Sequence, residues 1–202
     1  MRINEITEGP HDPYTYKAIF FAGSPGAGKT YVARKLAGLF QGLKQVNMDI
    51  IFKHLMTKKN LSWKMPPEEE PEREKQRQRS KELVAKQQQS FADSGLGLLI
   101  DSTGRILGTV RRIKDELEDK GYETTMIFVN TDLETALRRN KERERTLPDK
   151  LIHQNHDVIE QRLGEFQRMF NDVHIIDNSA SAQDTMPKQI AQVEKDIRKF
   201  LQ

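Results

Sequence analysis

Eight residues near the start of the chain, GSPGAGKT, have the types and spacing needed to bind the phosphates of a nucleotide. They fit the pattern G-x-x-x-x-G-K-[ST], in which backbone N–H groups surround the phosphates. Glycine lets this loop curl with its N–H groups pointing inward. Lys29 is predicted to bridge the β- and γ-phosphates, and the Thr30 hydroxyl to help hold Mg²⁺. The predicted cofactor-binding residues are Gly23, Ser24, Pro25, Gly26, Ala27, Gly28, Lys29 and Thr30.

Two aspartates are predicted to end strands further along the chain, Asp49 the second strand (QVNMD) and Asp101 the third (GLLID). Open α/β sheets bind ligands at the carboxyl ends of their strands, so we expect both carboxylates beside the phosphate loop. Asp49 is predicted to be the base that takes a proton from an attacking hydroxyl. Asp101 is predicted to hold Mg²⁺ or one of its waters, together with Thr30. An isolated aspartate after a strand can also be a helix cap.

Arginines gather in the segment 137–150, LRRNKERERTLPDK. Phosphoryl transfer spreads negative charge over the γ-oxygens, and an arginine from a closing lid stabilises that charge. We predict Arg139 and Arg143 as catalytic residues, with Arg145 a further candidate, and residues 138–150 as the lid. The alternative is a solvated Arg/Glu helix face held by i,i+4 ion pairs.

Weaker signals suggest further contacts. Asn178, in a polar loop after the last predicted strand, is predicted to contact the adenine. His153 and His156 are spaced for a metal on one helix, but no third ligand accompanies them. Phe52 and Trp63 have the rings needed to stack a base, although partly buried packing is favoured for both.

These side chains require a parallel sheet to position them. Short apolar runs alternate with amphipathic helical segments, the pattern of a sheet with helices on both faces. We predict an α/β, three-layer P-loop NTPase fold with a five-stranded, mainly parallel sheet. The expected strands are 17–22, 44–48, 96–100, 124–130 and 173–176.

The chain of 202 residues is expected to form one domain, residues 16–202, after an N-terminal tail, residues 1–15. A proline-bearing loop from residue 57 leads into a charged helix expected from residue 75, and residues 57–93 together form an insertion near the acceptor site. A net charge of +3 is too small to indicate nucleic-acid binding by itself.

Other functional classes are disfavoured by composition. The absence of cysteine excludes disulfides, thiolate zinc sites and a cysteine nucleophile. No apolar run approaches the length of a membrane span, and the first residues are too polar for a signal peptide. We therefore expect a cytoplasmic protein with no membrane association. Its oligomeric state is left open.

Two non-kinase classes share the phosphate loop. A GTPase switch is suggested by D-x-x-G at 101–104, but the guanine-binding N-K-x-D is missing, and its nearest match, 140–143, ends in arginine. A motor subunit normally needs an acidic pair after the third strand, whereas Ile100-Asp101-Ser102 provides one carboxylate. A kinase is therefore the favoured function, and a nucleotide-dependent switch or motor without a phosphoryl acceptor is the alternative.

The motifs GSPGAGKT, VNMD, LLIDSTG, RRNKER and TLP occur in this order over most of residues 17–178. Together they resemble the P-loop kinases related to the kinase domain of polynucleotide kinase and to the zeta toxins. In the polynucleotide kinase pattern the aspartate that activates the acceptor hydroxyl corresponds to Asp49, and the lid arginine corresponds to Arg143. Where that pattern has an acceptor-orienting arginine, this chain has Phe52, followed by Lys53.

The resemblance implies ATP and Mg²⁺ as cofactors and a hydroxyl-bearing acceptor as the second partner. A polynucleotide 5′-hydroxyl, a nucleotide or a nucleotide sugar are the favoured acceptors. A small metabolite and a protein side chain stay open, as does the biological role: toxin, nucleic-acid repair enzyme or metabolic kinase.

Overall fold

The computed structural model describes residues 13–142 and 146–202. They form a five-stranded sheet in the order β2-β3-β1-β4-β5, with every neighbouring pair parallel. The predicted sheet is confirmed, although β2 is shorter than expected. The strands are β1 (Lys17–Ala22), β2 (Lys44–Val46), β3 (Leu98–Asp101), β4 (Glu123–Asn130) and β5 (Val173–Asp177).

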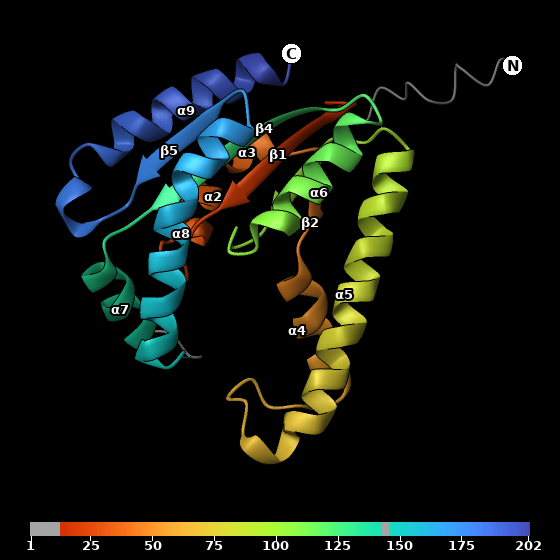
Figure 1. Cartoon of the computed structure of the whole chain (residues 1–202), viewed down its shortest axis with the longest axis vertical. Helices are drawn as coiled ribbons and strands as arrows, with labels where there is room; N and C mark the ends of the chain where they lie inside the picture. Colours follow the sequence, from red (N-terminus) through yellow and green to blue (C-terminus); the bar gives the residue numbers. More distant parts are fainter. Residues whose placement is uncertain (1–12, 143–145) are drawn as a thin grey trace, which may run out of the picture.

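Helices cover both faces of this sheet and give three layers (Figure 1). One face packs against α5 (Glu70–Asp93), α6 (Leu107–Glu118) and α8 (Asp149–Met169). The other packs against α2 (Lys29–Lys35), α3 (Ala37–Phe40) and α9 (Met186–Phe200). The predicted three-layer α/β fold is therefore confirmed. Among the described residues, no helix is long and apolar enough to cross a bilayer.

The central strands bury both of their faces. Phe20 and Phe128 belong to the core cluster on one side of the sheet, whereas Ile19 and Ile127 belong to the cluster on the other side. All four side chains are at most 2% exposed. Successive residues of a strand point to opposite faces, so a strand buried on both sides must be apolar throughout. This requirement explains the continuous apolar runs from which β1 and β4 were predicted.

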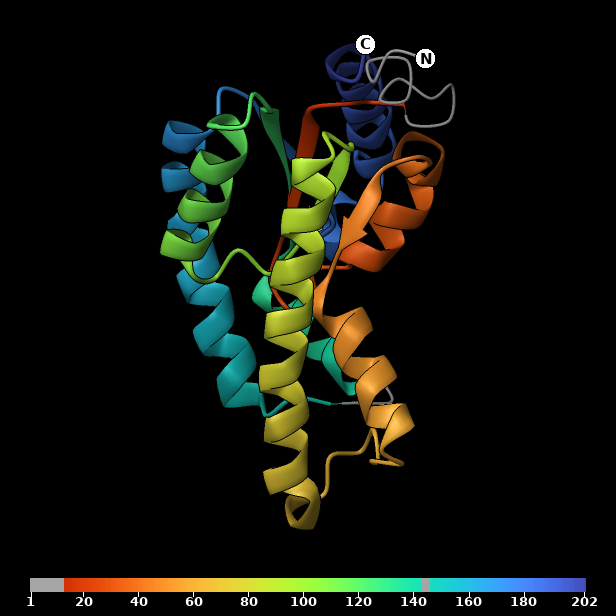
Figure 2. The ribbon, with the colours of Figure 1, turned by 90° about the vertical axis from the view of Figure 1, so that its right-hand side faces the viewer.

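An arm, residues 48–80, extends beyond the carboxyl edge of the sheet (Figures 1 and 2). It consists of α4 (Met48–Lys58), the short helix η1 (Pro67–Glu69) and the first half of α5. The charged helix of the insertion was predicted to begin at Lys75. This prediction is wrong, because the helix, α5, already begins at Glu70. Pro71 in the first turn has its φ fixed at a helical value, and the acidic residues of that turn interact favourably with the helix dipole.

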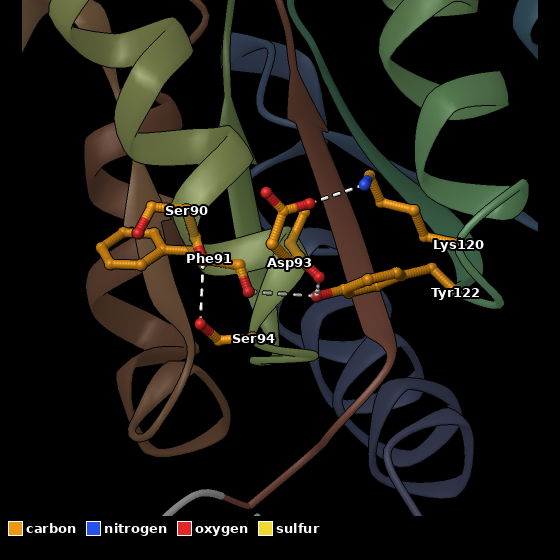
Figure 3. A network of polar contacts seen from close by, with 7 residues as sticks. Ser90, Phe91, Asp93, Ser94, Lys120 and Tyr122 are labelled. Carbon is orange, nitrogen blue, oxygen red and sulfur yellow. Dashed lines mark hydrogen bonds and ion pairs between the residues drawn. The ribbon is translucent and has the colours of Figure 1, made fainter.

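Helix α5 is anchored to the sheet layer at its C-terminal end, as Figure 3 shows. The Tyr122 hydroxyl donates to the Leu96 carbonyl oxygen at 2.8 Å. Nearby, Lys120 Nζ donates to Asp93 Oδ1 at 2.6 Å. Burial, aided by the proximity of Tyr16 and Asp93, raises the pKa of Tyr122 to about 12. The hydroxyl therefore stays protonated and remains a hydrogen-bond donor at neutral pH.

Candidate functional site

A pocket of about 1040 Å³ opens at the carboxyl edge of the sheet. The phosphate loop forms one side of it, and the N-terminal turn of α4 and Trp63 from the arm form another. The end of β3, helix α2 and α7 (Leu133–Lys141) contribute further lining residues. The structure thereby brings together five of the side chains that were predicted to act on the phosphates, the metal or the acceptor: Lys29, Thr30, Asp49, Asp101 and Arg139.

The phosphate loop has a backbone that glycine alone fits at two positions. Gly26 has φ +88°, and a Cβ placed there would lie 2.7 Å from the Ala136 carbonyl oxygen. Gly28 has φ +85°, and its Cβ would collide with the side-chain amide nitrogen of Asn178. Positive φ together with close neighbours excludes any side chain. The glycine pattern therefore has a structural cause here, and the resulting loop fits nucleotide phosphates.

Lys29 and Thr30 begin helix α2 directly after this loop. The Lys29 Nζ donates to the Gly23 carbonyl oxygen at 2.8 Å, so the ammonium group lies over the start of the loop. Thr30 is exposed and lines the pocket. Both side chains therefore lie in the pocket beside the loop, and their contacts with phosphate and Mg²⁺ stay predictions.

Asn178 and Arg139 support the loop from its outer side. Asn178 is 2% exposed, and its Nδ2 donates to the Ala27 carbonyl oxygen at 2.8 Å. Arg139 donates to the Gly26 carbonyl oxygen at 3.4 Å and to Asn178 Oδ1 at 3.3 Å. The Asn178 amide thus contacts the loop through its nitrogen and Arg139 through its oxygen, and its predicted contact with adenine stays a prediction. Burial lowers the pKa of Arg139, but a guanidinium remains protonated in proteins.

The two aspartates reach the pocket from different kinds of element. Asp101 is the last residue of β3, as predicted, and lies beside Phe21 in the register of the parallel pair β1–β3. The prediction that Asp49 ends a strand is wrong, because β2 ends at Val46 and Asp49 lies in the first turn of α4. The cause is Asn47, whose side-chain oxygen accepts hydrogen bonds from two backbone N–H groups and so starts the helix.

The Asp101 carboxyl is partly desolvated, and burial raises its pKa. Lys29 and a hydrogen bond from Asn47 act in the opposite direction, while Asp49 adds to the increase. The Asn47 Nδ2 donates to Asp101 Oδ2 at 2.5 Å. Mg²⁺ prefers oxygen ligands such as carboxylates and keeps several waters. Asp101 and the Thr30 hydroxyl therefore fit a Mg²⁺ ion bound with nucleotide phosphates.

The arm contributes an aromatic and cationic wall. Phe52 is 3% exposed and packs against Trp63, with 6.4 Å between the ring centroids. The Arg77 guanidinium lies 5.3 Å from the Phe52 ring centroid. Phe52 is therefore a packing residue. Trp63 is half-buried and lines the pocket, and Lys53 Nζ lies 5.8 Å from its ring centroid.

Part of the predicted lid lies outside the described residues, including Arg143 and Arg145. Its flanks are fixed by Asn140, which is 1% exposed. Asn140 Nδ2 donates to the Leu147 carbonyl oxygen at 2.7 Å, and its Oδ1 accepts from the Leu147 N–H at 3.0 Å. Sequence reasoning missed this role of Asn140. It missed the role of Asn47 as well, although an asparagine before an apolar helical run is a recognised start signal.

Of the two histidines that are spaced for a metal, His156 contacts the backbone and His153 is exposed. His156 Nε2 lies 2.9 Å from the Thr131 carbonyl oxygen, and His153 is exposed on α8. Throughout residues 13–142 and 146–202, no three His, Cys, Asp or Glu side chains are grouped to hold a metal ion. The two histidines therefore have no third partner of this kind in the described chain.

Comparison with known proteins gives one family. The family model described as zeta toxin matches residues 2–189. A search of curated proteins found no significant match.

Solved structures with kinase folds are similar over most of the chain. A structure from the PezAT chromosomal toxin–antitoxin system of Streptococcus pneumoniae is 20% identical, with a TM-score of 0.62 over 98% of this chain and 92% of that one. Shikimate kinase from Acinetobacter baumannii, in complex with shikimate, is 20% identical, with a TM-score of 0.52 over 89% and 93%. A chain of the Pnkp1/Rnl/Hen1 RNA repair complex is 17% identical, with a TM-score of 0.57 over 77% and 47%.

Proposed function

Because this chain belongs to the zeta toxin family, we propose that it is an ATP- and Mg²⁺-dependent kinase that phosphorylates a hydroxyl group. The resemblance to P-loop kinases predicted from the motifs is confirmed by the family match. One observation supports the proposed reaction most directly. A phosphate-binding loop and two carboxylates from different elements line the same pocket.

The proposed roles follow from position and charge. Asp49 is exposed in the pocket and accepts the proton of the acceptor hydroxyl. The hydroxyl oxygen forms a bond to the γ-phosphorus as the bond between that phosphorus and the bridging oxygen of ADP breaks. Lys29 and Arg139 stabilise the negative charge on the phosphates, and Arg143 is proposed to join them from the lid. Mg²⁺, held by Thr30 and Asp101, would neutralise phosphate charge.

The acceptor class that we propose is a polynucleotide 5′-hydroxyl, a nucleotide or a nucleotide sugar. The pocket volume lies at the upper end of the usual range for ligand sites, which leaves room for a second substrate beside ATP. The arm lines the pocket with the Trp63 ring and the Lys53 cation, and α2 adds the Arg34 cation. A flat ring and positive charges suit a base with its phosphates.

The alternative is a nucleotide-dependent switch or motor, in which water is the only phosphoryl acceptor. Asp49 favours the kinase, because its carboxylate lies on the arm side of the pocket. A residue there faces a second substrate, whereas a switch needs only a water near the γ-phosphate.

The test is transfer of labelled γ-phosphate from ATP into separate pools of 5′-hydroxyl oligonucleotides, nucleotides, nucleotide sugars and cell extract. We expect label in one pool with the native chain, and none with Lys29→Ala. Asp49→Asn should bind ATP as tightly as the native chain but lose transfer. Label released only as inorganic phosphate, at a rate unchanged in Asp49→Asn, would contradict the kinase assignment.

We further propose that this kinase acts as a toxin. The family match and the similarity to a structure from a toxin–antitoxin system support this role. Induced expression of the native chain in a bacterial host should arrest growth, whereas Lys29→Ala and Asp49→Asn, produced at equal levels, should not. Equal growth of all three strains would argue against a toxin.

A further inference from the structure

One side-chain amide in the pocket contacts both carboxylate-bearing elements. Val46 of β2 is paired with Ile100 of β3 in the parallel register, so the next residues, Asn47 and Asp101, lie side by side. Asn47 Nδ2 donates to Asp101 Oδ2 at 2.5 Å. Asn47 Oδ1 accepts from the backbone N–H of Asp49 at 2.8 Å and of Ile50 at 3.3 Å. Both ends of the amide are therefore engaged.

We propose that Asn47 is a positioning residue that holds the metal-binding carboxylate and the base in one arrangement. This inference rests on the proposed function, because it assigns Asp101 to Mg²⁺ and Asp49 to the acceptor. The hydrogen bond on Oδ2 fixes the rotation of the Asp101 carboxylate and leaves Oδ1 for the ion or its water. The cap fixes the first turn of α4, and with it the backbone of Asp49.

Capping alone does not explain asparagine at this position. A helix cap needs only an acceptor oxygen, which serine, threonine or aspartate supplies equally well. The second contact needs a donor that reaches a neighbouring carboxylate, and aspartate has none at neutral pH. Asparagine supplies the acceptor and the donor from one planar group. The hydrogen bond that Asn47 donates to Asp101 therefore distinguishes asparagine from the other capping residues.

The arrangement also links the nucleotide side of the pocket to the acceptor side. Asp101 belongs to the sheet next to the strand that leads into the phosphate loop, whereas Asp49 belongs to α4 of the arm. Asn47 spans the junction between them. Groups that contact metal ligands typically change metal affinity by about 10-fold to 100-fold when they are removed. We expect the loss of Asn47 to weaken the affinity for Mg²⁺ by a factor of this size.

Asn47→Ser keeps a capping oxygen, but its side chain is too short to cap the helix and also donate to Asp101 as the amide does. Calorimetry measures the affinity for AMP-PNP with and without Mg²⁺, a measurement that needs no acceptor. For the native chain we expect Mg²⁺ to tighten binding. For Asn47→Ser we expect an unchanged affinity without Mg²⁺, with the gain from Mg²⁺ reduced about 10-fold or more. Asn47→Thr is a second variant with a capping oxygen, for use if Asn47→Ser does not fold.

A double-mutant cycle with Asp101→Asn separates positioning from a general loss of structure. If Asn47 acts through Asp101, Asn47→Ser has no further effect on the Mg²⁺ gain in the Asp101→Asn background. A native Mg²⁺ gain in Asn47→Ser, or additive losses in the double variant, would overturn the inference and leave the kinase proposal standing. If the native chain bound AMP-PNP with the same affinity with and without Mg²⁺, both the role of Asn47 and the proposal of a Mg²⁺-dependent kinase would be overturned.

Discussion

At the scale of single residues, side-chain amides organise this site. Asn178 and Asn140 are both at most 2% exposed, and each hydrogen-bonds backbone groups with its oxygen, its nitrogen or both. Buried amides need partners, because an unpaired buried polar group costs about 1–3 kcal/mol. The phosphate loop and the junction of α7 with α8 therefore depend on contacts that leave the charged residues available for chemistry.

Asn178→Ala should weaken nucleotide binding. The substitution leaves the Ala27 carbonyl oxygen and the Arg139 guanidinium without their amide partner. A loss of about 1.4 kcal/mol in the organisation of the loop corresponds to about 10-fold weaker binding of AMP-PNP. Calorimetry measures this affinity, with the exposed Asn171→Ala as the control. Native affinity in Asn178→Ala would show that the loop does not need this amide.

At the scale of secondary-structure elements, the C-terminal end of α5 is held by Tyr122 and Lys120, two residues between α6 and β4. The Tyr122 hydroxyl donates to the Leu96 carbonyl oxygen at 2.8 Å. Figure 3 shows it beside Phe91 at the end of α5. The other end of the helix belongs to the arm. Changes at Tyr122 should therefore act on folding stability and not on nucleotide chemistry.

Tyr122→Phe should change how stability depends on alkaline pH. The pKa of Tyr122 is about 12 in the folded chain and about 10 in an unfolded one. A raised pKa contributes stability that is complete below pH 10 and is lost as pH rises towards 12. At pH 11 the native chain should have lost roughly 1 kcal/mol of this contribution, which the variant never had.

Urea unfolding at pH 8 and pH 11 checks this expectation. The difference in unfolding free energy between the native chain and Tyr122→Phe should shrink between the two values. Tyr31→Phe, at an exposed tyrosine, provides the control for general alkaline effects. A difference that is constant with pH would contradict the raised pKa.

Asn140→Ala should destabilise the junction of α7 and α8. Two hydrogen bonds to Leu147 are lost, and the Leu147 backbone groups lose their partner. We expect a cost of about 2 kcal/mol, which corresponds to a fall of about 4–8 °C in Tm for a chain of this size. Thermal unfolding followed by circular dichroism measures it, with the exposed Arg138→Ala as the control on the same helix. A Tm equal to that of the control would mean that the junction is held by other contacts.

At the scale of the whole molecule, the pocket is bordered by the sheet edge, the arm and α7, so a nucleotide bound in it would contact several elements at once. A ligand that binds only the folded chain stabilises it by mass action. Nucleotide binding should therefore be visible as global stabilisation, even before an acceptor is known.

AMP-PNP with Mg²⁺ should raise the Tm of the native chain. At a concentration of 100 Kd the stabilisation is about 2.7 kcal/mol, or roughly 5–11 °C for about 200 residues. Differential scanning fluorimetry measures the shift, and Lys29→Ala should reduce it sharply. An absent shift for the native chain at millimolar nucleotide would argue against the phosphate-loop assignment.

Elements whose signals are local could be predicted from the amino-acid sequence alone. The backbone of the phosphate loop, residues 23–30, requires the glycines of its pattern, because Gly26 and Gly28 have φ values that other residues rarely adopt. The apolar runs of β1 and β4 predict buried parallel strands because both of their faces are covered. Asp101 and Asp49 were predicted at the pocket because strand ends of a parallel sheet meet at one edge.

The tertiary structure decided the contacts between residues that are distant in the chain. Asn47 and Asp101 are 54 positions apart, and Asn178 and Ala27 are 151 apart. Local periodicity contains no information on the strand order or register that brings such pairs together. The placement of Asp49 on α4 instead of on a strand has a local cause, the cap that Asn47 forms over two and three residues. The hydrogen bond from Asn47 to Asp101, by contrast, exists only once the fold has set the distance between β2 and β3.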